Sequence, residues 1–125
     1  MVSETIPDEV REFVQKHVDS IAQLEALLLL RRESSTTWDA PTVAKRLYIP
    51  DHDAAEVLGE LLARGFLRCD GKIFQYQCSA EMDTLVGNVA AVYARQLIPM
   101  THLIHNKSIR IREFADAFKL RKEPK

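Results

Sequence analysis

Long apolar runs are missing from this 125-residue chain, and cysteine is scarce. No stretch approaches the roughly 20 consecutive apolar residues that a membrane-spanning helix needs. The acidic, polar N-terminus also lacks the pattern of a secretory signal peptide. We therefore expect a cytoplasmic protein without membrane contact. The only cysteines, Cys69 and Cys78, flank an expected turn at a spacing that disfavours a disulfide, so two free thiols are expected, with a redox switch as the alternative.

The chain also lacks a surplus of positive charge. It has 17 Lys and Arg against 18 Asp and Glu, a net charge of -1. DNA-binding domains usually carry a basic surplus, because much of their affinity comes from neutralising phosphates. Residues 1–106 hold ten basic against fifteen acidic residues, whereas residues 107–125 hold seven against three. Basic character is therefore concentrated in the C-terminal segment.

Patterns that would carry catalysis or hold a cofactor are equally sparse. His102 and His105 lie three residues apart, but no cysteine or carboxylate accompanies them at a zinc-ligand spacing. The Ser and Thr residues at 34–37 lack the glycine-rich loop and the Gly-Lys pair that hold phosphates. No nucleophile is paired with a base in a recognisable motif. We therefore predict no enzymatic activity, no metal and no cofactor.

What the sequence does contain is helical periodicity along most of its length. Pro7 begins a helix whose apolar residues recur at three- and four-residue spacing up to Val18. Ser20 and Gln23 have the spacing of a capping box, and the helix that follows is apolar on more than one side. A long helix is expected from Ser79 to Leu97, ended or kinked by Pro99.

Beyond that proline, residues 100–104 are expected to continue at an angle, and residues 105–107 to form a break. A last helix would then place Ile111, Phe114, Ala115 and Phe118 inward and its basic residues outward. Two aromatic residues on one short helix need a surface to cover, which indicates packing within the chain or against a second copy.

The central segment, residues 38–76, predicts two helices followed by a hairpin. Asp39 can cap the first helix, and Pro50 ends it because the residue before a proline avoids helical geometry. The second helix, at residues 51–64, stops at Gly65. Strands are expected at residues 66–69 and 72–76, joined by an Asp70-Gly71 turn.

Three pieces of this segment carry a family resemblance: Val43-Ala44-Lys45-Arg46-Leu47, then Val57-Leu58-x-x-Leu61-x-x-Arg64-Gly65-Phe66-Leu67, then the Asp70-Gly71 turn. In this order they resemble the winged helix-turn-helix of bacterial transcription regulators, especially the MarR-like ones. The resemblance implies that residues 51–64 enter the major groove of DNA and that the hairpin contacts the neighbouring minor groove or backbone. It also implies dimerisation through terminal helices.

The predicted fold class is mostly α with a small β-hairpin (α+β), a winged helix-turn-helix core with flanking N- and C-terminal helices. We expect one domain over residues 1–125, with the core at 20–78 and helices for packing or dimerisation at 79–125. The candidate dimerisation residues are Tyr93, Leu97, Phe114 and Phe118, and the candidate DNA-binding residues are Thr37, Lys45, Arg46, His52, Arg68, Lys72 and Gln75.

The helix at 51–64 departs from the pattern of a DNA-reading helix. A step of about 100° per residue puts the following residues opposite the core-facing Leu58: His52, Asp53, Glu56, Gly59, Glu60 and Ala63. None of them is an Arg, Lys, Asn, Gln, Ser or Thr, the residue types that contact bases and phosphates. We predict a DNA-binding transcriptional regulator with an acidic recognition helix, because that use of the fold dominates. The alternative is a winged-helix module for protein–protein interaction that does not bind DNA, which the charge count favours.

Overall fold

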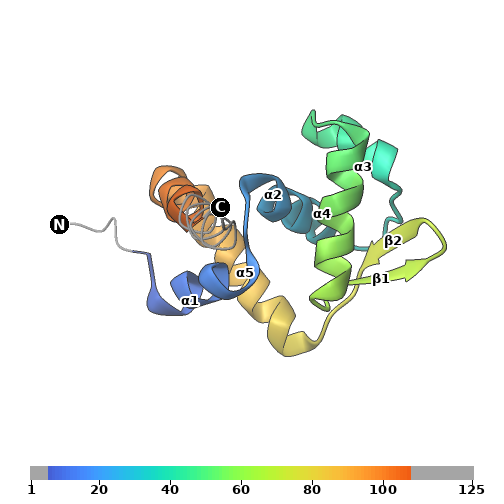
Figure 1. Ribbon diagram of the computed structural model, residues 1–125. Helices are drawn as coiled ribbons and strands as arrows, with labels where there is room; N and C mark the ends of the chain where they lie inside the picture. Colours follow the sequence, from blue (N-terminus) through green and yellow to red (C-terminus); the bar gives the residue numbers. More distant parts are fainter. Residues whose placement is uncertain (1–5, 108–125) are drawn as a thin grey trace, which may run out of the picture.

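The computed structural model describes residues 6–107 and places their elements in two groups (Figure 1). One group holds α2 (Ile21–Arg32), α3 (Ala40–Leu47), α4 (Asp51–Ala63) and a hairpin of β1 (Leu67–Asp70) and β2 (Ile73–Tyr76). The other holds α1 (Asp8–His17), α5 (Ala80–Arg95) and a helix at residues 97–107. This arrangement confirms the predicted fold class, a mostly helical chain with a two-stranded antiparallel hairpin in a winged-helix layout.

The three helix starts predicted from capping residues are confirmed. Ser20 Oγ accepts from the backbone N–H of Gln23 at 3.1 Å, and Ser79 Oγ accepts from that of Met82 at 3.1 Å. Asp39 Oδ1 accepts from the N–H of Thr42 at 3.0 Å. Each bond satisfies a donor in the first turn that has no partner within the helix. These contacts span three residues, which is why the sequence alone predicts them.

Helix α4 ends as Gly65 predicts. Gly65 has φ +89°, its N–H donates to Leu62 O at 3.1 Å, and the N–H of Phe66 donates to Leu61 O at 3.1 Å. This pair of bonds is a Schellman motif, which needs a left-handed residue that glycine adopts without steric cost. The motif turns the chain directly into β1.

The hairpin forms, but its predicted turn is wrong. Asp70 pairs with Ile73, so the turn residues are Gly71 and Lys72, and Cys69 lies opposite Phe74. Gly71 has φ +67° and Lys72 does not have a positive φ, which is the pattern of a type II′ turn with glycine first. An Asp70-Gly71 turn of type I′ would have required a positive φ at Asp70 as well.

A short third strand segment contributes to the register. Trp38 pairs with Phe74 in an antiparallel bridge: the N–H of Trp38 donates to Phe74 O at 2.8 Å, and the N–H of Phe74 donates to Trp38 O at 2.7 Å. The hairpin, hereafter the wing (residues 67–76), is therefore bonded to the chain just before α3. The sequence analysis did not predict this contact, which joins residues far apart along the chain.

The C-terminal helices differ from the prediction in where they break. Helix α5 stops at Arg95, and Gln96 has φ -126° and ψ 58°. Residues 97–107 then form one helix with Pro99 in its first turn, where a missing N–H costs little. The predicted break at 105–107 is wrong: Lys107 remains helical, and its Nζ donates to Val14 O at 3.1 Å and to Val18 O at 2.8 Å. The predicted final helix lies outside the described residues.

One apolar cluster joins both groups of elements, with α2 at its centre. Leu24, Leu27 and Leu30 of α2 are fully buried, and so are Ala26 and Leu29 on its other sides. This confirms that the second helix is buried on more than one side. The cluster also contains Leu58 of α4 and Val86 of α5, so the winged-helix elements and α5 share one core.

A polar junction of Asp19, Gln23, Arg64 and Lys107 lies beside this core. Asp19 receives Arg64 Nη2 at 2.7 Å on Oδ2 and Lys107 Nζ at 3.0 Å on Oδ1. Arg64 Nη1 also donates to His17 O, at the C-terminal end of α1. The two cations donate to carbonyl groups at the C-terminal end of α1, among them those of His17 and Val18, where a helix leaves its last carbonyls without partners. The junction therefore ties α1, α4 and the helix at 97–107 to one another.

His17, whose backbone carbonyl accepts from Arg64 in this junction, makes the stability of the fold sensitive to pH. The His17 ring packs against Phe13 and Phe66, with centroid distances of 4.9 Å and 5.6 Å. Burial, and then the charges of Lys16, Arg64 and Lys107, lower the pKa of His17 below 6.5. As pH falls below that value the unfolded chain binds a proton that the folded chain does not bind, so the folded state loses stability.

We therefore expect the urea midpoint of the wild type to be lower at about pH 5.5 than at about pH 7.5, and this difference to shrink in His17→Gln. His102→Gln, at an exposed position, is the matched control and should keep the full difference. An unchanged pH dependence in His17→Gln would assign the effect to other groups.

Candidate interaction surface

A groove opens between the N-terminal ends of α3 and α4 and the tip of the wing. Its volume is about 730 Å³. Most of its lining is apolar, from Ala40, Pro41, Ala55, Ile73 and Phe74, and its charged lining residues are Asp39, Asp51 and Lys72. We call it the α4–wing groove. It lies where the winged-helix resemblance implies that DNA would bind.

Carboxylates stand at both helix N-termini of this groove, as the cap of α3 and as first-turn residues of α4. Asp39 caps α3, and hydrogen bonding to Thr42 holds the pKa of Asp39 below its usual value, so it stays ionised. Pro41, in the first turn of α3, has no N–H to offer. Asp51 and Asp53 stand in the first turn of α4. Helix N-termini bind phosphate when their N–H groups are free and no anion is nearby. At α3 the N–H of Thr42 is already bonded to Asp39, and at α4, which has no side-chain cap, Asp51 and Asp53 place negative charge in the first turn.

The outward face of α4 is acidic and apolar. Its exposed residues are Asp51, His52, Ala55, Glu56, Gly59, Leu62 and Ala63. Helix α4 contains no Lys or Arg at all, and Arg64, just after it, is held in the polar junction. One predicted member of this face is misplaced: Glu60 is half-buried and accepts a hydrogen bond from Gln23 Nε2 at 2.7 Å. Asp53 is half-buried as well, beside His52 at 3.2 Å.

The candidate DNA-binding residues do not form one surface. Lys72 and His52 both line the α4–wing groove. Arg68 and Gln75 are partners across the wing, with Arg68 Nε donating to Gln75 Oε1 at 3.1 Å, and Gln75 donates to Ser34 O. Arg46 is bound to Glu33 at 2.8 Å and lies over the Trp38 ring. Thr37 and Lys45 are exposed, and neither lines the groove.

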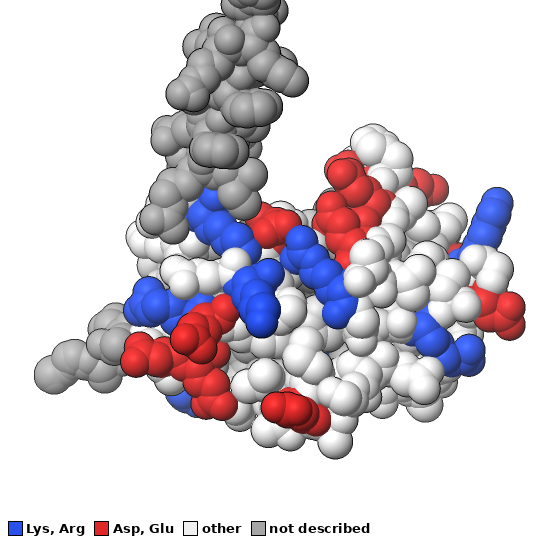
Figure 2. Space-filling model, turned by 60° about the horizontal axis from the view of Figure 1, so that its bottom comes forward, with Lys and Arg blue, Asp and Glu red and all other residues white. Residues whose placement is uncertain are grey.

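Figure 2 shows how charge is distributed over one face of the molecule. Blue and red side chains alternate on a largely white surface, and the described residues form no continuous blue band on this face. A DNA-binding surface usually presents such a band to follow the phosphate backbone.

The wing is held in place on its other side by partly buried polar contacts. Tyr76 Oη donates to Asp83 Oδ1 at 2.6 Å, and Arg31 Nε donates to the same oxygen at 3.0 Å. These bonds, that of Tyr76 first, lower the pKa of Asp83, while burial and then the bond to Asp83 raise the pKa of Tyr76. The wing is therefore bonded to α5 through Tyr76, to Ser34 in the loop after α2 through Gln75, and to Trp38 before α3 through Phe74, which makes the groove wall a fixed surface.

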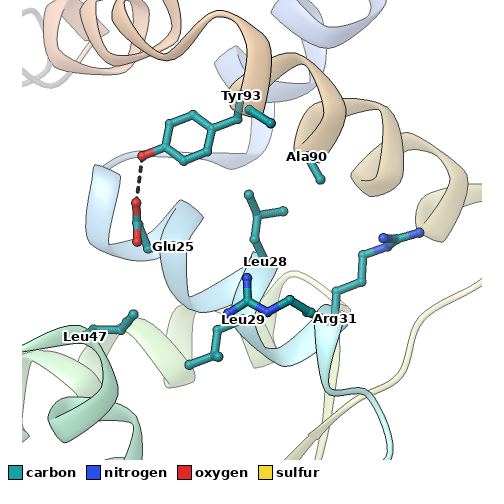
Figure 3. A pocket seen from close by; sticks show the side chains of 9 residues that line it. Glu25, Leu28, Leu29, Arg31, Leu47, Ala90 and Tyr93 are labelled. Atoms are coloured by element: carbon teal, nitrogen blue, oxygen red, sulfur yellow. Dashed lines mark hydrogen bonds between the residues drawn. The ribbon is translucent and has the colours of Figure 1, made fainter.

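A second cavity, of about 430 Å³, lies between α2, the end of α3 and α5 (Figure 3). Leu28, Leu29 and Leu47 supply apolar lining, and Tyr93 Oη donates to Glu25 Oε2 at 2.7 Å. Burial and this bond raise the pKa of Tyr93 to about 12. The sequence analysis did not predict the bond from Tyr93 to Glu25, because the two residues stand 68 positions apart.

The other candidate dimerisation residues have separate outcomes. Leu97 is 51% exposed, and its neighbour Ile98 is 62% exposed, so the two form an apolar patch that the sequence analysis only half identified. Phe114 and Phe118 lie outside the described residues. A homodimer through these residues stays a prediction.

No protein-family model, curated protein or solved structure matches this chain. The resemblance to MarR-like regulators therefore rests on the sequence pattern and stays a prediction. None of the helices within residues 6–107 is long and apolar enough to cross a membrane. Over the same residues, no three His, Cys, Asp or Glu side chains gather in a way that could hold a metal ion.

Proposed function

We propose that this protein is a winged-helix module that binds another protein through the α4–wing groove and does not bind DNA there. The observation that carries the proposal is the pair of carboxylates that line the groove at the helix N-termini, Asp39 at α3 and Asp51 at α4, with Asp53 in the same first turn of α4. Carboxylates a few ångströms from a DNA backbone repel it, and the exposed face of α4 offers no cation to offset them.

The apolar lining supports the same function. Ile73 of the wing is 41% exposed, and it shares the groove with Ala55, Pro41 and Phe74. An apolar groove with a charged rim is typical of a surface that excludes water on contact with a protein partner. DNA presents mainly charged and polar groups, so an apolar floor contributes little to its binding.

Site-specific photo-crosslinking in the native cells tests this function. A benzophenone amino acid at Ala55, which is exposed and lines the groove, should give a crosslinked product whose size nuclease treatment does not change. The matched control is the same amino acid at Gln15, exposed on α1 and away from the groove, where this product should be absent (Figure 1). A product at Ala55 that nuclease removes would contradict the proposal.

DNA binding through the wing is the second candidate function, and the exposed cations Lys45, Arg68 and Lys72 favour it. In this case the protein would bind duplex DNA at low salt, with an affinity that falls steeply as salt is added. Lys72→Ala and Arg68→Ala would each weaken that binding while leaving the fold intact. Anisotropy with labelled genomic fragments separates the two functions, since the protein-binding module shows no binding in this assay.

A further inference from the structure

We infer that the partner of the α4–wing groove is a protein segment in which a Lys or Arg side chain is flanked by aliphatic residues. This inference rests on the proposed protein-binding function and names the chemistry of the partner. It is carried by the groove itself, which combines an apolar floor with carboxylates contributed by two different helices.

The charges select a cation. Asp39 and Asp51 both line the groove, and each stands at a helix N-terminus. The side chain of Asp39 is fixed by its bond to Thr42, so its second oxygen can accept from a partner without further ordering. Lys72, at the turn of the wing, is the one Lys or Arg that the groove lining includes among the described residues. Negative charge therefore exceeds positive charge along the lining.

The floor selects aliphatic neighbours. Ala40 and Pro41 of α3, Ala55 of α4, and Ile73 and Phe74 of the wing give it three apolar walls. A long Lys or Arg side chain lays its methylene groups along such a surface while its charged end reaches a carboxylate. The aliphatic residues beside it then bury the exposed part of Ile73, which is 41% accessible in the free protein.

The wing supports binding of a segment without large rearrangement. Trp38 and Phe74 are bonded through their backbones at 2.7 Å and 2.8 Å, and Tyr76 is anchored to Asp83. The floor of the groove is thus formed before the partner arrives, so the segment supplies most of the ordering cost itself.

The test uses the full-length chain and fluorescein-labelled nonapeptides followed by anisotropy at low salt. The probe alternates arginine and leucine, and two control peptides replace either all arginines with glutamine or all leucines with serine. We expect the probe to bind and both controls to bind at least tenfold more weakly. Equal binding of the glutamine peptide would overturn the cationic assignment, and equal binding of the serine peptide would overturn the aliphatic one.

The matched variants remove charge without removing structure. Asp39→Asn keeps a good N-cap, because asparagine caps as well as aspartate. The double variant Asp39→Asn/Asp51→Asn should weaken binding of the probe about fivefold, from the loss of two partly exposed ion pairs. Glu9→Gln/Glu12→Gln removes two exposed carboxylates from α1, away from the groove, and should leave binding unchanged. A similar loss in both double variants would mean general attraction to an acidic protein, and would overturn the inference.

Two further outcomes separate the protein-binding function of the groove from the chemistry of its partner. A protein crosslink at Ala55 without binding of the arginine–leucine probe would overturn this partner chemistry and leave the protein-binding function standing. A peptide that copies residues 108–125 has six Lys and Arg among its residues. Tighter binding of this peptide than of the probe would assign the groove to the chain's own C-terminal segment and overturn the assignment to a separate partner.

Discussion

Replacing Phe66 with alanine is expected to lower the free energy of unfolding by about 4 kcal/mol, the largest effect of any single change considered for this chain. Phe66 is fully buried, and its ring lies 5.8 Å from that of Phe13 and 5.6 Å from that of His17. Its backbone N–H completes the motif that ends α4, and its carbonyl accepts from the N–H of Gln77 at 2.9 Å. The side chain therefore fills the point where α1, α4 and the wing meet.

Urea denaturation followed by circular dichroism measures this change. Phe66→Leu leaves a smaller cavity and should cost about 1.5 kcal/mol. Ile73→Ala, at an exposed position on the same hairpin, is the control and should change stability by less than about 0.5 kcal/mol. Small domains are stable by only about 5–15 kcal/mol, so the loss expected for Phe66→Ala is a large share of the total free energy of unfolding. A loss below about 1 kcal/mol would show that α1 does not share the core with the wing.

The parts of the fold that sequence predicts are those set by near neighbours. The caps at Ser20, Asp39 and Ser79 depend on contacts three residues away, and Gly65 needs only its own positive φ. The hairpin register fails for the opposite reason. Asp70-Gly71 is a favoured turn by local statistics, but the bridge between Trp38 and Phe74 draws on residues that no local pattern connects.

The same distinction applies to the candidate site. Helical periodicity correctly placed His52, Glu56 and Gly59 on the outward face of α4. It misplaced Glu60, because a helical wheel does not show that Gln23 of another helix lies across from it with a free amide N–H. The α4–wing groove itself could not be predicted, since its lining comes from three elements whose spacing depends on the register of the wing.

Two arginines of the winged-helix core are already paired with carboxylates of the same chain. Arg64 directly follows α4, and Arg46 lies in the last turn of α3, the first helix of the helix-turn-helix. The structure commits both to internal carboxylates, Arg64 to Asp19 and Arg46 to Glu33. An arginine that is already paired gains less from a phosphate, because it must give up its first partner. Neither arginine lines the α4–wing groove, so neither offsets the carboxylates there.

Replacing Arg64 with alanine is expected to lower the free energy of unfolding by about 2 kcal/mol, the second largest effect. The change removes charge-assisted bonds to Asp19 Oδ2 and to His17 O, and leaves both acceptors in a partly buried position. Arg64→Lys keeps the charge without the planar fork that serves two acceptors at once, and should cost about 1 kcal/mol. Arg32→Ala, at an exposed position on α2, is the control and should be nearly neutral.

The loss of stability at acidic pH tests whether Arg64 acts by pairing with Asp19. Burial acts to raise the pKa of Asp19, but the hydrogen bonds from Arg64 and Lys107 outweigh it and hold the pKa below 3.8. Asp19 therefore contributes stability that is fully present above its unfolded pKa and is lost as pH falls through the lower folded value. In Arg64→Ala the folded pKa moves back toward 3.8, so the loss of stability below about pH 4 becomes shallower. If Arg64 instead served a bound phosphate, its removal would leave both the urea midpoint and the stability at acidic pH unchanged, and the loss would be confined to DNA affinity.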